Sequence, residues 1–326
     1  MVQFMSESSN NLKFVENLMV DSGAFSVWKS GASVNLDEYI SFCLRYKNDL
    51  QVIVALDVIP GCISDKDTPP KEVIQKACEE GWENYLKMLS AGLPKSKVIP
   101  VFHQLDGWEW LQRYLDFGSP YIGLSPRKNG IGARAYNRIW LDHCMKYVCD
   151  KDGNPKVKLH GFGITNMTFL YRYPWYSCDS ITWKITGMFG SIMVPYIQAD
   201  GTWNFLRRQR RFIFSTKKGA CSKIKGRHYD HLPLSVQKNL EDYIHSIGLE
   251  MGESRFREEP LHYKCNRTHE NVFEKHSDHL VIEEKIIKGV RNDTDERNKA
   301  NLYFFERVQS QLPWPRKYQF FEHSIL

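Results

Sequence analysis

Short apolar runs alternate with longer amphipathic segments along the first half of the chain. Runs of strand length, most of them rich in β-branched residues, lie at 17–21, 51–57, 97–104, 120–125, 156–164 and 177–183. Segments with apolar residues at helical spacing lie at 36–48, 69–89 and 133–150. Continuous apolar runs are typical of parallel strands buried on both faces. Their order of strand, helix and strand, at intervals of roughly 30 to 45 residues, predicts a repeated βα unit.

Polar or small residues mark the C-terminal ends of these predicted strands, namely Asp21, Asp57, Gln104, Ser125, Gly163 and Asp179. The loops at this end of a (β/α)8 barrel build its active site. A doubly wound nucleotide-binding sheet also binds ligands at strand ends, but the chain has neither a G-x-G-x-x-G turn nor a Walker loop. We therefore expect an α/β fold with a TIM-type (β/α)8 barrel, whose last two strands come from 190–215 or from the C-terminal third.

The C-terminal third has a weaker pattern. Residues 233–248 have helical spacing, and the polar run at 291–301 is either the start of a helix or a loop. We find no internal repeat and no long low-complexity linker. The expected organisation is a barrel over 1–215 followed by a mostly helical extension over 216–326, which is basic at its start.

Composition and charge narrow the class of protein. A chain of 326 residues can bury a large core. Its net charge of +6 is modest, so a basic surface has to be local. The eight cysteines are scattered without tight pairing and no secretory signal opens the chain, which favours the reducing cytoplasm. No run of about 18 apolar residues is present, and no membrane span is expected.

Residues 207–227 form the most one-sided charged segment, with nine Lys or Arg and no Asp or Glu. Such a segment is either an exposed basic loop or a surface that binds nucleic-acid phosphates. Phe212 and Phe214 within it either stack on bases or belong to a strand, and we favour the strand. The candidate nucleic-acid-binding residues are Arg207, Arg208, Arg210, Arg211, Lys217, Lys218, Lys223, Lys225 and Arg227.

Three aspartates at strand ends, Asp21, Asp57 and Asp179, call for a common explanation. A carboxylate at the end of a buried strand costs free energy to desolvate unless it is paired or hydrogen-bonded. Several of them converging on one face therefore indicate a functional site. Each one alone is equally typical of a helix cap or a turn.

The segments that end these strands resemble the motifs of the tRNA-guanine transglycosylases. In chain order they are DSGAFS (21–26), ALD (55–57), FHQLDG (102–107), YIGLS (121–125), LHGFGIT (159–165) and CDSITW (178–183). The resemblance covers about 17–190 and implies a barrel. It also implies an enzyme that exchanges a guanine base in a nucleic acid for a 7-deazaguanine, without a cofactor.

The resemblance gives the two outer aspartates catalytic roles. Breaking and remaking one N-glycosidic bond with retention requires a carboxylate nucleophile and a second group that handles the proton. By position in the motifs, Asp179 would be the nucleophile that forms a covalent sugar intermediate. Asp21 would be the general acid and base. Retaining glycosidases suggest that the two carboxyl groups lie within about 5 to 7 Å of each other.

The other motif positions imply recognition of the base. Asp57 would accept hydrogen bonds from N1–H and the exocyclic amine of guanine. Gln104 and the backbone N–H around Gly123 would meet O6 and N7, and Phe25 and His160 would sandwich the ring. Alternatively, Phe25 packs in the core and His160 supports a neighbour through a hydrogen bond. The expected base-binding set is Ser22, Phe25, Asp57, Gln104, Gly123, Leu124, His160 and Gly161.

Several positions depart from the tRNA enzymes. His160 stands where methionine is usual, and Ser26, Thr182 and Trp183 also differ. The zinc-binding C-x-C-x-x-C run of those enzymes has no counterpart. His262, Cys265, His269, His276 and His279 are close in the sequence, but histidines at such spacing in a polar segment are usually solvated, and we expect no metal.

A shorter chain without the zinc run is similar to the DNA-guanine transglycosylases of phages and mobile islands, which place 7-deazaguanines in DNA and so resist restriction nucleases. We therefore expect DNA and a free 7-deazaguanine base as substrates, with the target base flipped out of the duplex. The alternatives are a tRNA-guanine transglycosylase without zinc, a non-catalytic nucleic-acid-binding partner subunit, and an unrelated barrel hydrolase whose Asp57 and Asp179 point apart. The presence of both Asp21 and Asp179 argues against the partner subunit. Neither the incoming base nor the oligomeric state has a signal in the sequence.

Overall fold

The chain folds into a mixed α/β structure with parallel sheets. The computed structural model describes residues 18–25, 28, 33–61, 68–126, 133–207, 209–216, 227–260 and 272–320. Its helices are α3 (Leu36–Arg45), α4 (Lys71–Ser90), α5 (Trp108–Asp116), α6 (Ala133–Val148), α7 (Met167–Arg172), α8 (Thr182–Met188), the 3-10 helix η3 (Tyr229–His231), α9 (Leu234–Ser246) and α10 (Thr294–Ser310). Its strands are β1 (Leu18–Val20), β2 (Leu50–Val54), β3 (Val98–Ile99), β4 (Val101–His103), β5 (Tyr121–Ser125), β6 (Lys158–Gly161), β7 (Ser177–Cys178), β8 (Ser191–Val194), β9 (Tyr196–Ile197), β10 (Trp203–Asn204), β11 (Arg210–Ile213), β12 (Glu253–Pro260), β13 (Val272–Lys275) and β14 (His279–Ile287).

Two compact units divide the chain. The first runs to Thr165 and also takes in Phe169–Asp179 and the chain from Trp314 onward. The second contains Asn166–Thr168 and Ser180–Pro313. The change from the first to the second unit after Asp179 comes earlier than the boundary expected at 215/216. The final segment belongs to the first unit because Tyr318 packs in its core.

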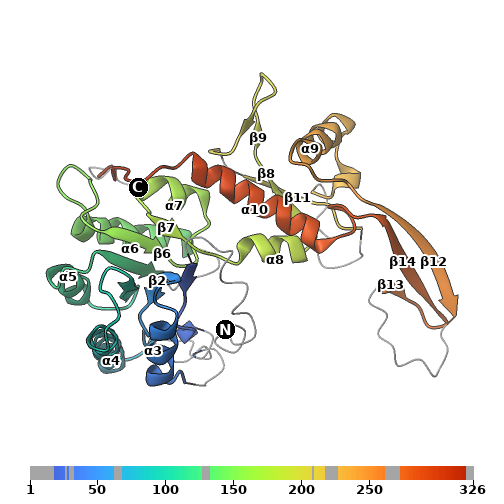
Figure 1. Cartoon of the computed structure of the whole chain (residues 1–326). Coiled ribbons are helices and arrows are strands. Elements are labelled where there is room, and N and C mark those ends of the chain that lie inside the picture. Colours follow the sequence, from blue (N-terminus) through green and yellow to red (C-terminus); the bar gives the residue numbers. More distant parts are fainter. Residues whose placement is uncertain are drawn as a thin grey trace. The chain divides into compact units, whose positions relative to one another are not determined.

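The strands of the first unit are parallel and neighbour one another in chain order. β1, β2 and β3 pair in one sheet, and β4, β5, β6 and β7 pair in another. Pro100 separates β3 from β4 because it has no N–H for the ladder. Its carbonyl still accepts a hydrogen bond of 2.9 Å from Gly123 N, which links the end of the first sheet to β5. Helices alternate with these strands along the chain (Figure 1).

The helices at 36–48, 69–89 and 133–150 are confirmed as α3, α4 and α6. α3 begins where the Asn35 side chain accepts hydrogen bonds from the backbone N–H groups of Asp37 and Glu38, which satisfies two donors that a helix start leaves open. α5 was not predicted. The strand expected over 177–183 ends at Cys178, and α8 occupies its second half.

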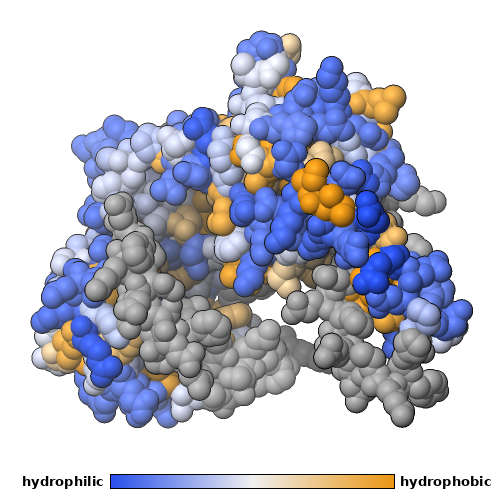
Figure 2. Space-filling model, turned by 45° about the vertical axis from the view of Figure 1, so that its right-hand side comes forward, coloured by the Kyte–Doolittle hydropathy of each residue, from blue (hydrophilic) through white to orange (hydrophobic). Residues whose placement is uncertain are grey.

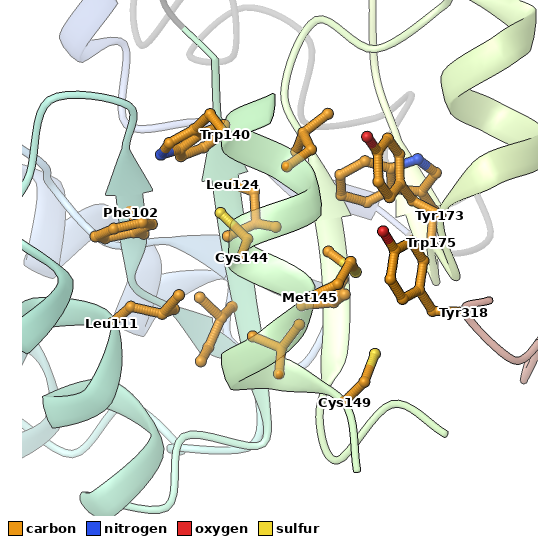
Figure 3. Packing of buried hydrophobic residues seen from close by; sticks show 14 of the residues in the cluster. Phe102, Leu111, Leu124, Trp140, Cys144, Met145, Cys149, Tyr173, Trp175 and Tyr318 are labelled. Carbon is orange, nitrogen blue, oxygen red and sulfur yellow. The ribbon is translucent and has the colours of Figure 1, made fainter. Parts of the chain in front are cut away.

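The two faces of these strands have different neighbours. One face packs against helices, and Figure 3 shows Phe102 and Leu124 of this face beside Trp140 of α6. The Phe102 and Trp140 rings stack with centroids 5.8 Å apart. The other face carries a smaller buried cluster of Val54, Ile99, Val101 and Tyr121, with Met19, Val52 and Phe162 against it. Because side chains alternate between faces, His103 and His160 follow this second face.

The end of the chain closes the helix-facing core of the first unit. The Tyr318 ring stacks on Tyr173 with centroids 5.9 Å apart (Figure 3). Its hydroxyl donates to Asp142 Oδ1 at 2.8 Å. The same carboxylate accepts two hydrogen bonds from Arg172, at 2.7 and 2.8 Å. This segment is therefore fixed by packing and by the hydrogen bond of Tyr318 to a carboxylate that is itself held by the bidentate ion pair with Arg172.

The second unit contains antiparallel strands. β8 and β11 lie in the region expected to supply the last barrel strands, but they pair antiparallel with each other. β12, β14 and β13 form an antiparallel sheet that the expected, mostly helical extension did not include. Phe212 is buried in β11, which confirms that it belongs to a strand, and Phe214 is buried one residue beyond the end of that strand.

Helix α10 holds α8 and β8 in the second unit. Asn301 of α10 is fully buried. Its Oδ1 accepts from Met193 N at 2.7 Å, and its Nδ2 donates to the carbonyls of Trp183 and Ser191 at 3.0 and 3.3 Å. Arg297, one turn earlier, donates from Nε to the Gly187 carbonyl at 2.8 Å.

Asn301→Ala is expected to lower the free energy of unfolding by about 3 kcal/mol, because it leaves three buried backbone groups without a partner and each such group costs about 1–3 kcal/mol. Denaturant unfolding monitored by circular dichroism measures the change. Gln309→Ala, at an exposed position of the same helix, is the matched control and should change stability by less than about 0.5 kcal/mol. Equal stabilities of the two variants would contradict the assigned role of Asn301.

The described surface is mainly polar. Figure 2 shows hydrophilic residues over most of one face, with apolar residues in separate patches. On α8 and beside it, Ile181, Ile185, Met188 and Phe189 are exposed. Among the residues that the structure describes, no helix combines the length and the apolar character that crossing a lipid bilayer requires.

Candidate active site

Three aspartates meet at the C-terminal end of the parallel strands. Asp21 directly follows β1, Asp179 directly follows β7, and Asp57 lies three residues beyond β2. Burial, and then repulsion from Asp57 and from Asp179, raises the pKa of Asp21 above its ordinary value, against the smaller effect of hydrogen bonds from the backbone of Gly23 and Ser22. Repulsion of this kind requires the charges to be near one another.

Asp57 is held by both of its carboxylate oxygens. Ser22 donates from Oγ to Asp57 Oδ1 at 3.0 Å, and His103 Nε2 lies 2.8 Å from Asp57 Oδ2. The side chains of His103 and Asp57 are 14% and 13% exposed. A carboxylate has about four lone-pair sites, so each oxygen can accept a further hydrogen bond. Asp57 therefore has a fixed orientation and remaining capacity for two donors of a ligand.

Asp179 is contacted mainly through one oxygen. Gly163, whose φ of 66° only glycine adopts readily, donates from its N–H to Asp179 Oδ1 at 2.9 Å. His160 Nε2 is buried without a hydrogen-bond partner among the described residues and lies 3.5 Å from the same oxygen, within the range of an electrostatic contact. Burial acts to raise the pKa of Asp179, but the contacts with His160 and Gly163 outweigh it and hold the pKa below its ordinary value. The side chain is 59% exposed, so the ionised carboxylate is accessible.

His160 lies beneath Asp179 and is 2% exposed. Its Nδ1 is 2.6 Å from Ser177 Oγ, and its ring meets Phe162 edge to face at 4.4 Å. No open ring face is left to sandwich a base. The contacts instead match the alternative in which His160 supports a neighbour through hydrogen bonds.

Phe25 is exposed rather than packed in the core, with 60% of its surface accessible. Its ring centroid lies 5.8 Å from that of Trp28. Trp28 donates from Nε1 to the Gly61 carbonyl at 2.6 Å, which ties the aromatic pair to the loop after Asp57. The exposed ring can stack on a flat ligand.

The other five expected base contacts are all buried. Ser22 and Gln104 are 2% and 7% exposed. The Gly123 N–H donates to Pro100, so it meets no ligand while the sheet bond is intact. Leu124 packs in the helix-facing core rather than lining an open surface. The Gly161 carbonyl accepts from Asp179 N at 3.3 Å, which makes this residue a support for Asp179.

His103, Ser177 and Trp28 join the site without having been singled out in the sequence, whereas Gly163 was noted only as a residue at a strand end. For His103 the signal was available, because it lies two residues after Val101 on the face that carries the site. For Ser177 the contact depends on pairing between strands. His160 and Ser177 are register partners of β6 and β7, and this register is not visible in the sequence.

The basic segment is described in part. Arg207, Arg210, Arg211 and Arg227 lie within the described residues, and Arg208, Lys217, Lys218, Lys223 and Lys225 lie outside them. Arg210 and Arg211 are exposed on β11, and Ile213 N donates to the Arg227 carbonyl at 2.9 Å. Although Arg211 is exposed as a whole, partial desolvation of its guanidinium group and then repulsion from Arg227 lower its pKa. Guanidinium groups that repel each other favour an anion between them.

No metal ligand set is found in the part of the chain that the structure describes, where no group of three or more His, Cys, Asp or Glu side chains has suitable geometry. His276 and His279 stack with centroids 4.4 Å apart. His262, Cys265 and His269 lie outside the described residues.

The geometry of the site is the basis for assigning its chemistry. Comparisons with family models, with curated proteins and with solved structures give no match to this chain. The first unit offers two neighbouring carboxyl groups whose pKa values are shifted in opposite directions, those of Asp21 and Asp179. It also offers an oriented third carboxylate and an exposed aromatic ring. Such a set can carry out acid–base chemistry and nucleophilic attack on a planar, hydrogen-bonding substrate.

Proposed function

We propose that the chain is a guanine transglycosylase that replaces guanine in DNA with a 7-deazaguanine. The observation that carries this proposal is the pair Asp21 and Asp179. They are close enough for repulsion to raise the pKa of Asp21, while the contacts of Asp179 lower its own pKa. One carboxyl group is thereby suited to give up a proton and the other to attack as an anion, which is the division of roles that a retaining exchange requires.

The reaction proceeds in two displacements. Asp179 attacks C1′ of the target nucleotide, and the bond from C1′ to guanine N9 breaks as the bond to the carboxylate oxygen forms. Asp21 gives its proton to the departing base. The incoming base then attacks C1′ through its own N9, transfers its N9 proton to Asp21, and releases Asp179. The two inversions give net retention, and both carboxyl groups return to their starting states.

Recognition of the base is assigned to Asp57 and Phe25. The two Asp57 oxygens, oriented by Ser22 and His103, accept from N1–H and the exocyclic amine of guanine. Adenine has no donor at N1, so it lacks one of these hydrogen bonds. Phe25 stacks on one face of the ring. Guanine and 7-deazaguanines share the edge that Asp57 meets, so one site serves both the leaving and the entering base.

We propose a barrel fold together with this function. Parallel strands that neighbour one another in chain order, with helices between them, support a TIM-type (β/α)8 barrel rather than a doubly wound sheet, in which the strand order reverses. The site at the C-terminal strand ends is where such a barrel carries its chemistry.

Exchange of labelled guanine tests the proposed function. The protein is incubated with radiolabelled guanine and, separately, with plasmid DNA, bulk tRNA or no polymer, and the label in precipitated polymer is counted. Label in DNA is the expected result. Label in tRNA alone would make the chain a tRNA enzyme, and label in neither polymer would overturn the proposal.

Arg210 and Arg211 are assigned to the DNA backbone. The double variant Arg210→Gln/Arg211→Gln should weaken binding of a duplex oligonucleotide and reduce the slope of log K against log salt by about 1.8, because each lost phosphate contact releases about 0.9 counterion less. Fluorescence anisotropy from 50 to 300 mM salt measures the slope. Lys76→Gln/Lys238→Gln removes two exposed charges elsewhere and is the control. The same slope for both double variants would remove β11 from the DNA-binding surface.

A further inference from the structure

A chain of polar contacts leads from the sheet to Asp179. The Tyr121 hydroxyl is hydrogen-bonded to Ser177 Oγ. Ser177 Oγ is 2.6 Å from His160 Nδ1, and His160 Nε2 is 3.5 Å from Asp179 Oδ1. The first three residues come from the adjacent strands β5, β7 and β6, in which His160 and Ser177 are register partners and Tyr121 pairs with Lys158. Strand pairing, rather than a loop, therefore sets the position of the imidazole.

The protons in this chain can be ordered in one favourable direction. Burial raises the pKa of the Tyr121 hydroxyl well above its ordinary value, so Tyr121 remains protonated and donates to Ser177. Ser177 has a single O–H, which then donates to His160 Nδ1. A neutral imidazole with an acceptor at Nδ1 carries its proton at Nε2. That N–H faces Asp179 Oδ1, whereas the opposite order would place a lone pair against the carboxylate.

The contacts also distinguish the two oxygens of Asp179. In the described part of the chain, the hydrogen bond from Gly163 and the contact with His160 both involve Oδ1. Oδ2 takes part in neither of these two contacts, while the side chain as a whole is largely exposed. An attacking oxygen has to be free of donors that would reduce its nucleophilicity, so Oδ2 is the better placed of the two.

We infer that His160 is a positioning residue that holds Asp179 ionised and turned so that Oδ2 faces the substrate, with Ser177 and Tyr121 fixing the tautomer of the imidazole. The inference rests on the proposed function where it makes Asp179 the nucleophile. The contact geometry and the state of Asp179 can be tested without it. The titratable groups that face Asp179 are His160 of β6, Asp21 after β1 and Cys178 of β7.

The test compares variants that remove or replace the Nε2–H donor. His160→Leu removes it, His160→Gln offers an amide N–H in its place, and Ser177→Ala removes the hydrogen bond that fixes the tautomer. The pKa of Asp179 is followed by carbon-detected NMR of protein labelled at the aspartate carboxyl carbon, with the Asp179 signal assigned from Asp179→Asn. His143→Gln, on helix α6, is the control.

We expect the pKa of Asp179 to rise in His160→Leu, since the contact of the imidazole with the charged carboxylate is lost. His160→Gln should restore part of the difference, and Ser177→Ala should give a smaller rise. An unchanged pKa in folded His160→Leu overturns the inference. If that variant does not fold, an unchanged pKa in Ser177→Ala overturns it instead.

The pH profile of base exchange separates this inference from the proposed function. The acidic limb of the rate, where Asp179 takes up a proton, should move to higher pH in His160→Leu and return toward the wild-type position in His160→Gln. A purely structural role would lower the rate at every pH without moving the limb. If no variant and no wild-type protein exchanges guanine while the NMR shift is present, the proposed function fails and the positioning role stands.

Discussion

Asp179→Asn is expected to abolish guanine exchange, with a loss of at least about 1,000-fold in rate, because the amide oxygen is a poor nucleophile and no covalent sugar intermediate forms. The assay has two readouts. Label incorporated into DNA reports the full exchange, and a protein–DNA adduct that survives denaturing electrophoresis reports the intermediate. Both should disappear together, since the adduct lies on the reaction path.

Asp200→Asn is the matched control for this prediction. Asp200 lies in the turn between β9 and β10, outside the candidate site, and the same change of charge there should leave both readouts within about twofold of the wild-type protein. An adduct that persists in Asp179→Asn would assign the nucleophile to another residue. Asp21 would then be the next to examine.

Asp21→Asn is expected to lower the exchange rate by about 100- to 10,000-fold, because an asparagine cannot pass a proton to the departing base or take one from the entering base. The pKa of Asp21 is raised by burial and by its two acidic neighbours, so the wild-type enzyme keeps the proton to higher pH than an ordinary aspartate does. Activity should fall as pH rises through that pKa. Asp21→Asn should lack this basic limb in its residual rate.

Asp21→Asn should raise the stability of the protein at neutral pH, although it lowers the exchange rate. A carboxyl group whose pKa is higher in the folded than in the unfolded chain contributes stability that is fully present below the unfolded pKa and is lost as pH rises through the folded pKa. Above that range, wild-type protein has three repelling carboxylates at the strand ends, and Asp21→Asn has two. Asp21→Asn should therefore be more stable than wild type at neutral pH, with the advantage shrinking toward low pH. Thermal unfolding at pH 3 and pH 7 measures this, and a loss of stability at pH 7 would contradict it.

Sequence patterns reveal the first unit of this fold better than the second. A buried parallel strand has to be apolar along its length, so runs such as 51–57 predicted β2, and the acid that ends the run marked the site. Helix α5 was missed because its nine residues are short for a periodic signal and include two tryptophans. β12 was missed because most of its residues are exposed and charged, and an edge strand of this kind has no apolar alternation to detect.

Some residues of the site could be predicted from the sequence and others could not, for a physical reason. Asp21 and Asp57 could be found because each stands at the end of an apolar run, and Asp179 could be found from the resemblance of the motif at 178–183. The partners that give them different properties could not, because Ser22 and His103 meet Asp57 across long separations in sequence. The exposure of Phe25 and the burial of His160 likewise depend on which strand face each side chain follows. The motif positions pointed to the aspartates, and strand pairing decided what each of them contacts.

The chain returns to the first unit from Trp314 onward, so the two parts of this unit are synthesised at different times. On the ribosome, the parallel strands and Asp179 emerge before any residue of the long insertion Ser180–Pro313. The first unit then lacks Tyr318, which stacks on Tyr173 and bonds Asp142, until the whole insertion has been translated. Domains fold as units as they emerge. The unit that carries the three aspartates therefore starts to fold first and is completed last. A polypeptide released before residue 318 keeps an open edge in the apolar cluster to which Tyr318 belongs.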